Sequence, residues 1–469
     1  MQETPSTQPK PTMRFDFVVI GGGSAGYAAA RTAADLGKKV AIVDGAKELG
    51  GLCILRGCMP SKTLIYSAEV LHFAQSGEIF GFTADNAKAD LAAMQRRKQE
   101  VIAEFAEYRQ GQLESDRFTL FRQKARFRDE GSIELTDGTV LVAEAFLVAT
   151  GSVSSSPEVP GLGETSFWTS DEVLELDELP ESVITLGGGV VACELAQFLA
   201  RVGVQVTLVQ RSPRILKEFS EEASLCVEQA FRDGGIEVFT DTQLEEVEET
   251  DEGVSVRFQH EGTLVERKAA HVFNALGRKP ATKGLGLEAA KVKLLPTGHL
   301  QTDGCQQTTN PRIYAAGDCA GPHEIVHVAI RQGETAASHA FGQATNPLGY
   351  DALLKVVFTD PQIAFVGLTE DELQARNVSF LTASYPFDDH GKSILMNAMR
   401  GYVKVIAEKS SGRVLGAECV GKDAGELIQA LSIAVSLRAD VRDLVQADWY
   451  HPTLSEIWTY PLEDIADEL

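Results

Sequence analysis

The chain of 469 residues is too long for one ordinary hydrophobic core, and 44% hydrophobic with 23% charged residues is typical of a water-soluble protein of about two to four domains. A formal charge of −24 repels phosphate backbones and anionic lipids, so we expect neither nucleic acid nor a membrane as partner. No uninterrupted apolar run of about 18 residues predicts a transmembrane helix. Seven thinly spread cysteines are unlike a secreted disulfide framework and favour a cytoplasmic location.

A dinucleotide-binding pattern follows residues 1–13, which are Gln-, Thr- and Pro-rich and are predicted to be a disordered lead-in. Residues 15–20 (FDFVVI) predict a strand, an Ala-rich helix follows, and 40–43 predict a second strand that ends at an acidic residue. The predicted nucleotide contacts are Gly21, Gly23, Ser24, Ala25, Gly26 and Asp44. Glycines let the backbone approach a pyrophosphate, and the acid can bind a ribose hydroxyl. The alternative is a glycine turn that arose by coincidence.

Two cysteines lie shortly after this pattern, within residues 50–62. Cys53 and Cys58 can close a short disulfide and pass electrons between a flavin and a sulfur substrate. We expect Cys53 near the start of a helix that runs through Lys62, where a thiolate is favoured. Lys62 is four residues beyond Cys58, on the same helical face. A structural bridge or a zinc site is the alternative, but no second Cys or His pair completes a tetrahedral site, so no metal is expected.

The nucleotide pattern recurs after a charged, helix-like stretch over residues 89–116. Strand 183–186 leads into Gly187, Gly189, Val190 and Val191, and a helix over 193–202 precedes a strand over 204–209. Gln210 stands where an NAD-binding acid is expected, and Arg211 and Arg214 follow it. Cations there accommodate a 2′-phosphate, which favours NADPH over NADH unless these arginines are solvated surface charges.

The third part of the chain differs in character. Short strands over 272–278 and 313–318 end in glycine turns, and from residue 347 alternating patterns at 355–358 and 402–407 precede a helix over 425–437. We therefore predict an α/β fold with two Rossmann-like domains and a C-terminal α+β domain. The predicted boundaries are 14–155 with 281–346 for FAD, 156–280 for NAD(P), and 347–469 for dimerisation.

Seven motifs in order resemble the pyridine nucleotide-disulfide oxidoreductases, the family of glutathione reductase, dihydrolipoyl dehydrogenase and mercuric reductase. They lie at 21–26, 53–62, 149–151, 187–194, 275–278, 316–318 and 451–456. The resemblance implies an EC 1.8.1-type enzyme with FAD in the first fold and NADPH or NADH in the second. It adds Gly51, Cys53, Lys62, Thr150, Gly151 and Asp318 to the FAD contacts, and Glu194 and Gly277 to those of NAD(P).

The same resemblance implies the catalytic roles. Cys58 faces the flavin, Cys53 attacks the substrate, and Lys62 pairs with Glu194 near the flavin. His451 moves protons, oriented by Glu456, and acts across the subunit boundary of a homodimer. Without the resemblance, Glu194 and His451 would be interpreted as surface residues, and Thr453 with Glu456 as a helix capping box.

The substrate is where the chain departs from its relatives. Leu55 stands where an Asn is common, no cysteine follows Cys419, and Glu334 stands where glutathione reductase would need a cation, although Ser24 and Arg31 fit. We therefore expect a dihydrolipoyl dehydrogenase-like enzyme for a small or protein-bound thiol or disulfide, with a lipoyl carrier protein as a further partner. The alternatives are a divergent paralogue reducing another disulfide, a metal ion or a quinone, and a flavoprotein subunit of a lipoyl-carrier complex.

Overall fold

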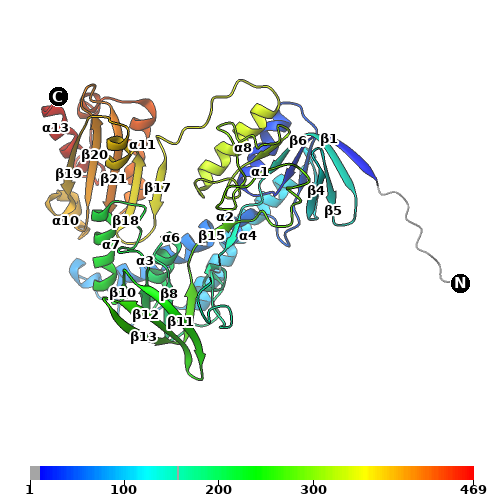
Figure 1. Ribbon diagram of the computed structural model, residues 1–469. Helices are drawn as coiled ribbons and strands as arrows, with labels where there is room; N and C mark the ends of the chain where they lie inside the picture. Colours follow the sequence, from blue (N-terminus) through cyan, green and yellow to red (C-terminus); the bar gives the residue numbers. More distant parts are fainter. Residues whose placement is uncertain (1–10, 156–157) are drawn as a thin grey trace. The chain divides into compact units, whose positions relative to one another are not determined.

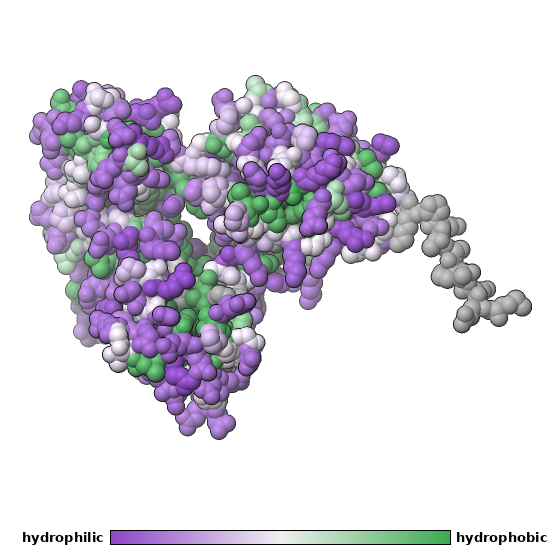
Figure 2. Space-filling model, in the orientation of Figure 1, coloured by the Kyte–Doolittle hydropathy of each residue, from purple (hydrophilic) through white to green (hydrophobic). Residues whose placement is uncertain are grey.

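The computed structural model describes residues 11–155 and 158–469, which form two compact units. Unit 1 contains the described residues of Met1–Thr63, Ala93–Ser155 and Gly277–Leu348, and unit 2 those of Leu64–Ala92, Ser156–Leu276 and Gly349–Leu469. None of the described helices is long and apolar enough to cross a membrane. Figure 2 shows a face covered mostly by hydrophilic residues, in keeping with the formal charge of −24.

The predicted lead-in differs from the structure at its end. Residues 1–10 lie outside the described residues, but Thr12 and Met13 already belong to strand β1 (Thr12–Ile20). They pair in register with Val140 and Leu141 of β6 (Val140–Val148). The lead-in predicted over 1–13 therefore extends too far, because a neighbouring strand supplies backbone partners that a local pattern does not reveal.

Unit 1 is built on a seven-stranded sheet in the order β3-β2-β1-β6-β5-β4, with β16 paired to β6 (Figure 1). β1, β2, β3, β6 and β16 run parallel, and β4 and β5 run antiparallel. The other strands are β2 (Val40–Val43), β3 (Phe118–Phe121), β4 (Ala125–Asp129), β5 (Ser132–Leu135), β16 (Ile313–Ala315) and the separate pair β7 (Ser152–Ser154) with β15 (Arg278–Pro280).

Both faces of the central strands are covered, which is why β1 and β2 are almost continuously hydrophobic. Phe17 and Val19 pack with small residues of α1 (Ser24–Asp35) and α8 (Val326–Ala340), while Val18 and Ile20 pack with Phe127 on the other face. The remaining helices with residues in unit 1 are α2 (Gly51–Leu55), α3 (Cys58–Gln75) and α4 (Leu91–Leu113), of which α3 and α4 also extend into unit 2.

Unit 2 holds three sheets. A parallel sheet has the order β10-β9-β8-β14, an antiparallel sheet the order β11-β12-β13, and a second antiparallel sheet the order β17-β18-β21-β20-β19 (Figure 1). The first two contain β8 (Ser182–Leu186), β9 (Gln205–Val209), β10 (Glu237–Phe239), β11 (Gln243–Thr250), β12 (Gly253–His260), β13 (Thr263–Ala269) and β14 (His271–Asn274). The third contains β17 (Leu354–Val357), β18 (Gln362–Gly367), β19 (Phe380–Pro386), β20 (Tyr402–Glu408) and β21 (Val414–Gly421).

Most of the described helices lie in unit 2. They are α5 (Ser170–Leu174), α6 (Val190–Arg201), α7 (Glu221–Asp233), α9 (Glu370–Ala375), α10 (Gly391–Leu395), α11 (Ala424–Leu437), α12 (Val441–Val445), α13 (Thr459–Asp467) and the 3₁₀ helices η1 (Gly77–Phe80), η2 (Phe387–Asp389) and η3 (Ser455–Trp458). Apolar residues of α11 and α13 pack with β20 and β21 in one core. Unit 2 contains most of both predicted later domains, 156–280 and 347–469, and these boundaries stay predictions.

Candidate active site

The glycine turn of unit 1 forms a tight bend between β1 and α1. Gly21 has φ +105°, and a Cβ on Gly26 would overlap the Gly21 carbonyl oxygen, so only glycine fits at both positions. A Cβ on Gly51 would lie 2.7 Å from Gly23 Cα. These backbones therefore leave a side-chain-free cradle before α1, where Ser24 and Ala25 begin the helix and a pyrophosphate fits.

The acidic residue of this pattern lies at the glycine turn. Asp44 Oδ2 accepts a hydrogen bond from Gly22 N at 2.8 Å, and Oδ1 accepts one from Ala46 N at 2.9 Å. A carboxylate has about four acceptor positions, so capacity remains for a ribose hydroxyl. The donor set and the cradle fit FAD.

A polar chain that the sequence did not predict surrounds Asp318. Ser152 Oγ donates to Asp318 Oδ2 at 2.6 Å and accepts from Arg278 Nε at 2.8 Å. Thr150 Oγ1 donates to the Ala281 carbonyl at 2.8 Å, and Gly151 follows with φ +71°. Arg278 closes the motif at 275–278, so its place there was the available signal; Ser152 left none.

The two cysteines lie at the junction of two helices. Cys53 is in α2, and Cys58 is the first residue of α3; Arg56 and Gly57 separate the helices. The prediction that Cys53 lies near the start of the helix through Lys62 is therefore wrong. The α2 helix ends at Leu55 and is followed by Arg56 with φ −144°, so the N-terminus of the next helix falls on Cys58.

The two thiols contact each other. A side-chain hydrogen bond to Cys58 raises the pKa of Cys53, burial raises it further, and the nearby Lys62 ammonium acts in the opposite direction. These effects favour the neutral thiol at Cys53. The N-terminus of α3, where Cys58 stands, is a position that favours a thiolate. Lys62 is half-buried, one helical turn beyond Cys58.

The second glycine turn, in unit 2, has a similar backbone and different side chains. Gly187 has φ +112°, and a Cβ on Gly189 would meet no atom of the described residues within 4 Å. Val190 and Val191 then begin α6. A Cβ on Gly188 would lie 3.0 Å from the Gln210 side chain, which occupies the place that Asp44 has in unit 1. This open cradle fits a second dinucleotide.

The two arginines beyond Gln210 differ. Arg214 is half-buried and donates from Nη2 to the carbonyls of Lys217 at 3.3 Å and Phe219 at 3.4 Å. Arg211 is exposed and has no hydrogen bond or ion pair to another described residue. Of these two cations, Arg211 is the one whose guanidinium is available to a ligand. Gly277, predicted to contact NAD(P), has φ +111° and lies in unit 1 just before β15.

Glu194 is not a surface carboxylate. It is 3% exposed in α6, and Oε1 accepts from the Phe358 backbone N at 2.9 Å. Three residues on, Gln197 exchanges hydrogen bonds with the backbone of Asp360, and Arg201 pairs with the Asp360 carboxylate at 2.5 Å. One face of α6 thus binds the loop between β17 and β18.

His451 and Glu456 form an imidazole–carboxylate pair. His451 Nδ1 lies 3.0 Å from Oε1 and 2.9 Å from Oε2, and the His451 side chain is 77% exposed against 12% for Glu456. Glu456 N donates to Thr453 Oγ1 at 3.3 Å, but the Glu456 side chain turns to His451. The carboxylate therefore orients an accessible imidazole.

Two features, one in each unit, bear on the substrate. Arg31 and Glu334 form a 2.7 Å ion pair, so Arg31 is already neutralised and is not a free cation for a glutathione carboxylate. Trp449 donates from Nε1 to the Leu444 carbonyl at 2.9 Å and packs on the C-terminal core, whereas Tyr450 is 81% exposed.

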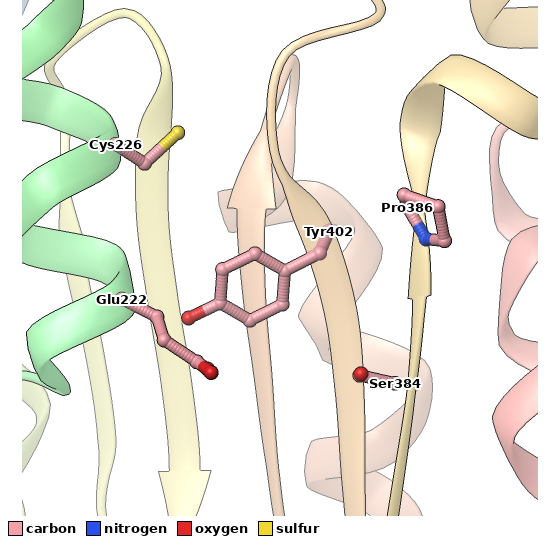
Figure 3. A pocket seen from close by; sticks show the side chains of 5 residues that line it. All are labelled: Glu222, Cys226, Ser384, Pro386 and Tyr402. Atoms are coloured by element: carbon pink, nitrogen blue, oxygen red, sulfur yellow. The ribbon is translucent and has the colours of Figure 1, made fainter.

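Unit 2 also contains a cavity of about 470 Å³. Figure 3 shows Glu222 and Cys226 projecting from α7 and Tyr402 reaching toward them from β20, with Ser384 and Pro386 on β19. None of the predicted site residues lines it.

Two dinucleotide cradles, a contacting thiol pair and an oriented imidazole define a flavin- and nicotinamide-dependent oxidoreductase. The chain matches the pyridine nucleotide-disulphide oxidoreductase family over residues 15–333 and its dimerisation domain over 354–461. The chain belongs to this family, and the predicted fold class and enzyme class are confirmed.

The relatives differ from one another in the activity for which they are named. A mercuric reductase of Bacillus cereus is 33% identical over 94% of this chain and 70% of its own length, and a dihydrolipoyl dehydrogenase of Thermus scotoductus is 34% identical over 94% and 95%. The crystal structure of LpdA from Mycobacterium tuberculosis has a TM-score of 0.87 and 30% identity, covering 96% and 99% of the two chains. The protein is thus an FAD-dependent enzyme that uses a nicotinamide nucleotide, and its dimerisation domain supports a homodimer.

Proposed function

We propose that this enzyme transfers electrons between NAD(P)H and a thiol/disulfide substrate of the dihydrolipoamide type, free or held on a lipoyl carrier protein. FAD, when bound, supplies the two-electron link between the nicotinamide and the cysteine pair. The observation that carries the proposal is the contact between the Cys53 and Cys58 side chains beside the FAD cradle. Full-length similarity to dihydrolipoyl dehydrogenases supports the substrate class.

The proposed sulfur chemistry consists of two successive thiol–disulfide exchanges. In the two-electron-reduced pair, Cys53 loses its proton to His451 of the partner subunit, and the Cys53 thiolate attacks one sulfur of the substrate disulfide. The other substrate sulfur leaves as a thiolate and takes that proton from His451. Cys58 thiolate then attacks Cys53 Sγ, forming the Cys53–Cys58 disulfide and releasing the second substrate sulfur, which takes a proton from solvent through His451. One disulfide gains two electrons and two protons, and the oxidising direction reverses each step.

Each remaining residue has an assigned part in this scheme. Glu456 orients His451 and stabilises its protonated form, and His451 serves the site of the partner subunit. The Lys62 ammonium favours negative charge near the flavin, and Glu194 is its proposed carboxylate partner. Arg211, being exposed and unpaired among the described residues, supports a preference for NADPH.

Steady-state rates with NADH and NADPH against lipoamide, glutathione disulfide and quinones test the substrate class. We expect lipoamide to be the best acceptor and glutathione disulfide a poor one, because Glu334 neutralises Arg31. Cys58→Ser should abolish both lipoamide reduction and the long-wavelength charge-transfer band of the two-electron-reduced enzyme. Activity that survives alkylation of the reduced thiols would instead support quinone reduction by the flavin alone.

A further inference from the structure

A second histidine lies behind the His451–Glu456 pair. His390, between η2 and α10, has a side-chain exposure of 0%, and its Nε2 lies 3.5 Å from Glu456 Oε1. Glu456 thus has an exposed imidazole on one side and a buried imidazole on the other. The catalytic steps given above make no use of the buried ring.

The hydrogen bonds of His390 select one tautomer. Nδ1 lies 2.8 Å from Ser393 Oγ, while Nε2 has no hydrogen-bond partner among the described residues. With the Ser393 hydroxyl as donor, Nδ1 accepts and Nε2 carries the hydrogen, which points toward the carboxylate. The other tautomer would direct a nitrogen lone pair at an anion, which is unfavourable. A buried N–H facing a carboxylate at 3.5 Å needs a small closure to form a good hydrogen bond.

Aromatic rings restrict the orientation of this imidazole. Phe387 and Tyr460 meet it edge-on, with ring centroids 6.5 and 6.4 Å away, and Tyr385 stacks on Tyr460 at 3.9 Å. Burial lowers the pKa of His390, against a smaller opposing effect of Glu456, so the neutral ring is the stable form. A neutral, fixed N–H donor such as His390 stabilises the Glu456 carboxylate without placing a second positive charge near the protonated His451.

We propose that His390 is a positioning residue that donates a hydrogen bond from Nε2 to Glu456 and holds the carboxylate in the orientation that contacts His451. The inference rests on the proposed role of His451 in the sulfur steps. It assigns His390 no contact with substrate or cofactor. Its loss should therefore slow proton transfer to and from sulfur while leaving reduction of the flavin by NAD(P)H intact.

The test compares two half-reactions of the FAD-loaded dimer by stopped flow: flavin reduction by NADPH, and reoxidation of the reduced enzyme by lipoamide. We expect His390→Leu to slow reoxidation about tenfold and flavin reduction less than about twofold. His390→Gln, which keeps an N–H donor near the Nε2 position, should restore most of the rate. Tyr385→Phe alters the same wall without reaching Glu456 and serves as the matched control, with both half-reactions unchanged.

Three results would overturn the proposal: no effect of His390→Leu on reoxidation, equal losses in the Leu and Gln variants, or equal slowing of both half-reactions. If His390→Leu does not fold, Ser393→Ala decides, because it releases the tautomer while keeping the ring. A loss of about threefold in its reoxidation supports the proposal, and no loss contradicts it. His451→Gln is the reference: if it reoxidises at the normal rate, the proposed function fails and not merely the role of His390.

Discussion

The two glycine turns share a strand–turn–helix backbone but differ at two side chains. In unit 1 the third small residue is Gly26, where a Cβ would overlap the Gly21 carbonyl, whereas unit 2 carries buried Ala192 at the matching position. The first helix therefore approaches its strand more closely than the second. Similar glycine patterns thus permit two different helix–strand distances.

The second difference lies at the end of the second strand. Asp44 accepts a hydrogen bond from the Gly22 amide. Gln210 packs beside Gly188 but, among the described residues, makes no hydrogen bond to that amide and donates instead to the Arg214 carbonyl at 3.4 Å. A negative charge at this position repels a 2′-phosphate. A neutral amide next to an exposed arginine does not repel it. The two turns thus repeat one backbone and differ in the side chains at the end of the second strand, Asp44 in unit 1 and Gln210 in unit 2.

The largest expected effect comes from the helix–strand distance. Gly26→Ala should destabilise the protein by about 4 kcal/mol or prevent flavin retention, since the new Cβ meets backbone that cannot rotate away. Thermal unfolding and the flavin content of the purified protein measure this. Gly189→Ala is the matched control in unit 2: its Cβ has open space, so the free energy of unfolding should change by less than about 1 kcal/mol. Equal destabilisation by the two substitutions would contradict the comparison.

An intermediate effect is expected from the nucleotide end. Arg211→Ala should lower kcat/KM for NADPH about tenfold or more and leave that for NADH nearly unchanged, because a charge-assisted bond to the 2′-phosphate is lost. Gln210→Asp should shift the nucleotide preference from NADPH toward NADH, because the new carboxylate repels the 2′-phosphate. Arg214→Ala is a contrasting variant, since its guanidinium binds loop carbonyls and should affect stability more than nucleotide choice. A loss for NADH equal to that for NADPH would show that Arg211 does not select the phosphate.

The smallest effect concerns pH. His271 lies in β14, an edge strand of the parallel sheet of unit 2, and its ring stacks on Trp168 with centroids 4.0 Å apart. Burial lowers the pKa of His271. Because the folded protein then binds the proton less tightly than the unfolded chain, this stability is fully present above the unfolded pKa of about 6.5 and is lost as pH falls through the lower folded pKa. His271→Phe keeps the stack and should reduce this acid loss, by less than about 1 kcal/mol, in unfolding measured between about pH 7 and pH 5. An unchanged pH dependence would contradict the assignment.

Much of the candidate site was predictable because its signals are local. The turn at Gly21, the strand before Asp44 and the turn at Gly187 each depend on neighbours within a few residues, and all appear in the structure. The spacing of Cys53 and Cys58 predicted a thiol pair, which the structure brings into contact. The sequence did not show that one helix ends at Leu55 and another begins at Cys58, because the cysteines form one continuous motif in the chain.

The family, the two nucleotide folds and the presence of a thiol pair could be predicted from the sequence alone, since each depends on residue types at fixed short spacing. Only the tertiary structure decided that Glu194 is buried against Phe358, that Arg31 is neutralised by Glu334, and that His390 lies behind Glu456. The residues of the first two contacts are 164 and 303 positions apart along the chain. For His390 an ordinary buried histidine is indistinguishable from a positioning one until the strands and helices are packed. Burial and charge pairing are properties of packed elements, and a pattern of neighbours does not carry them.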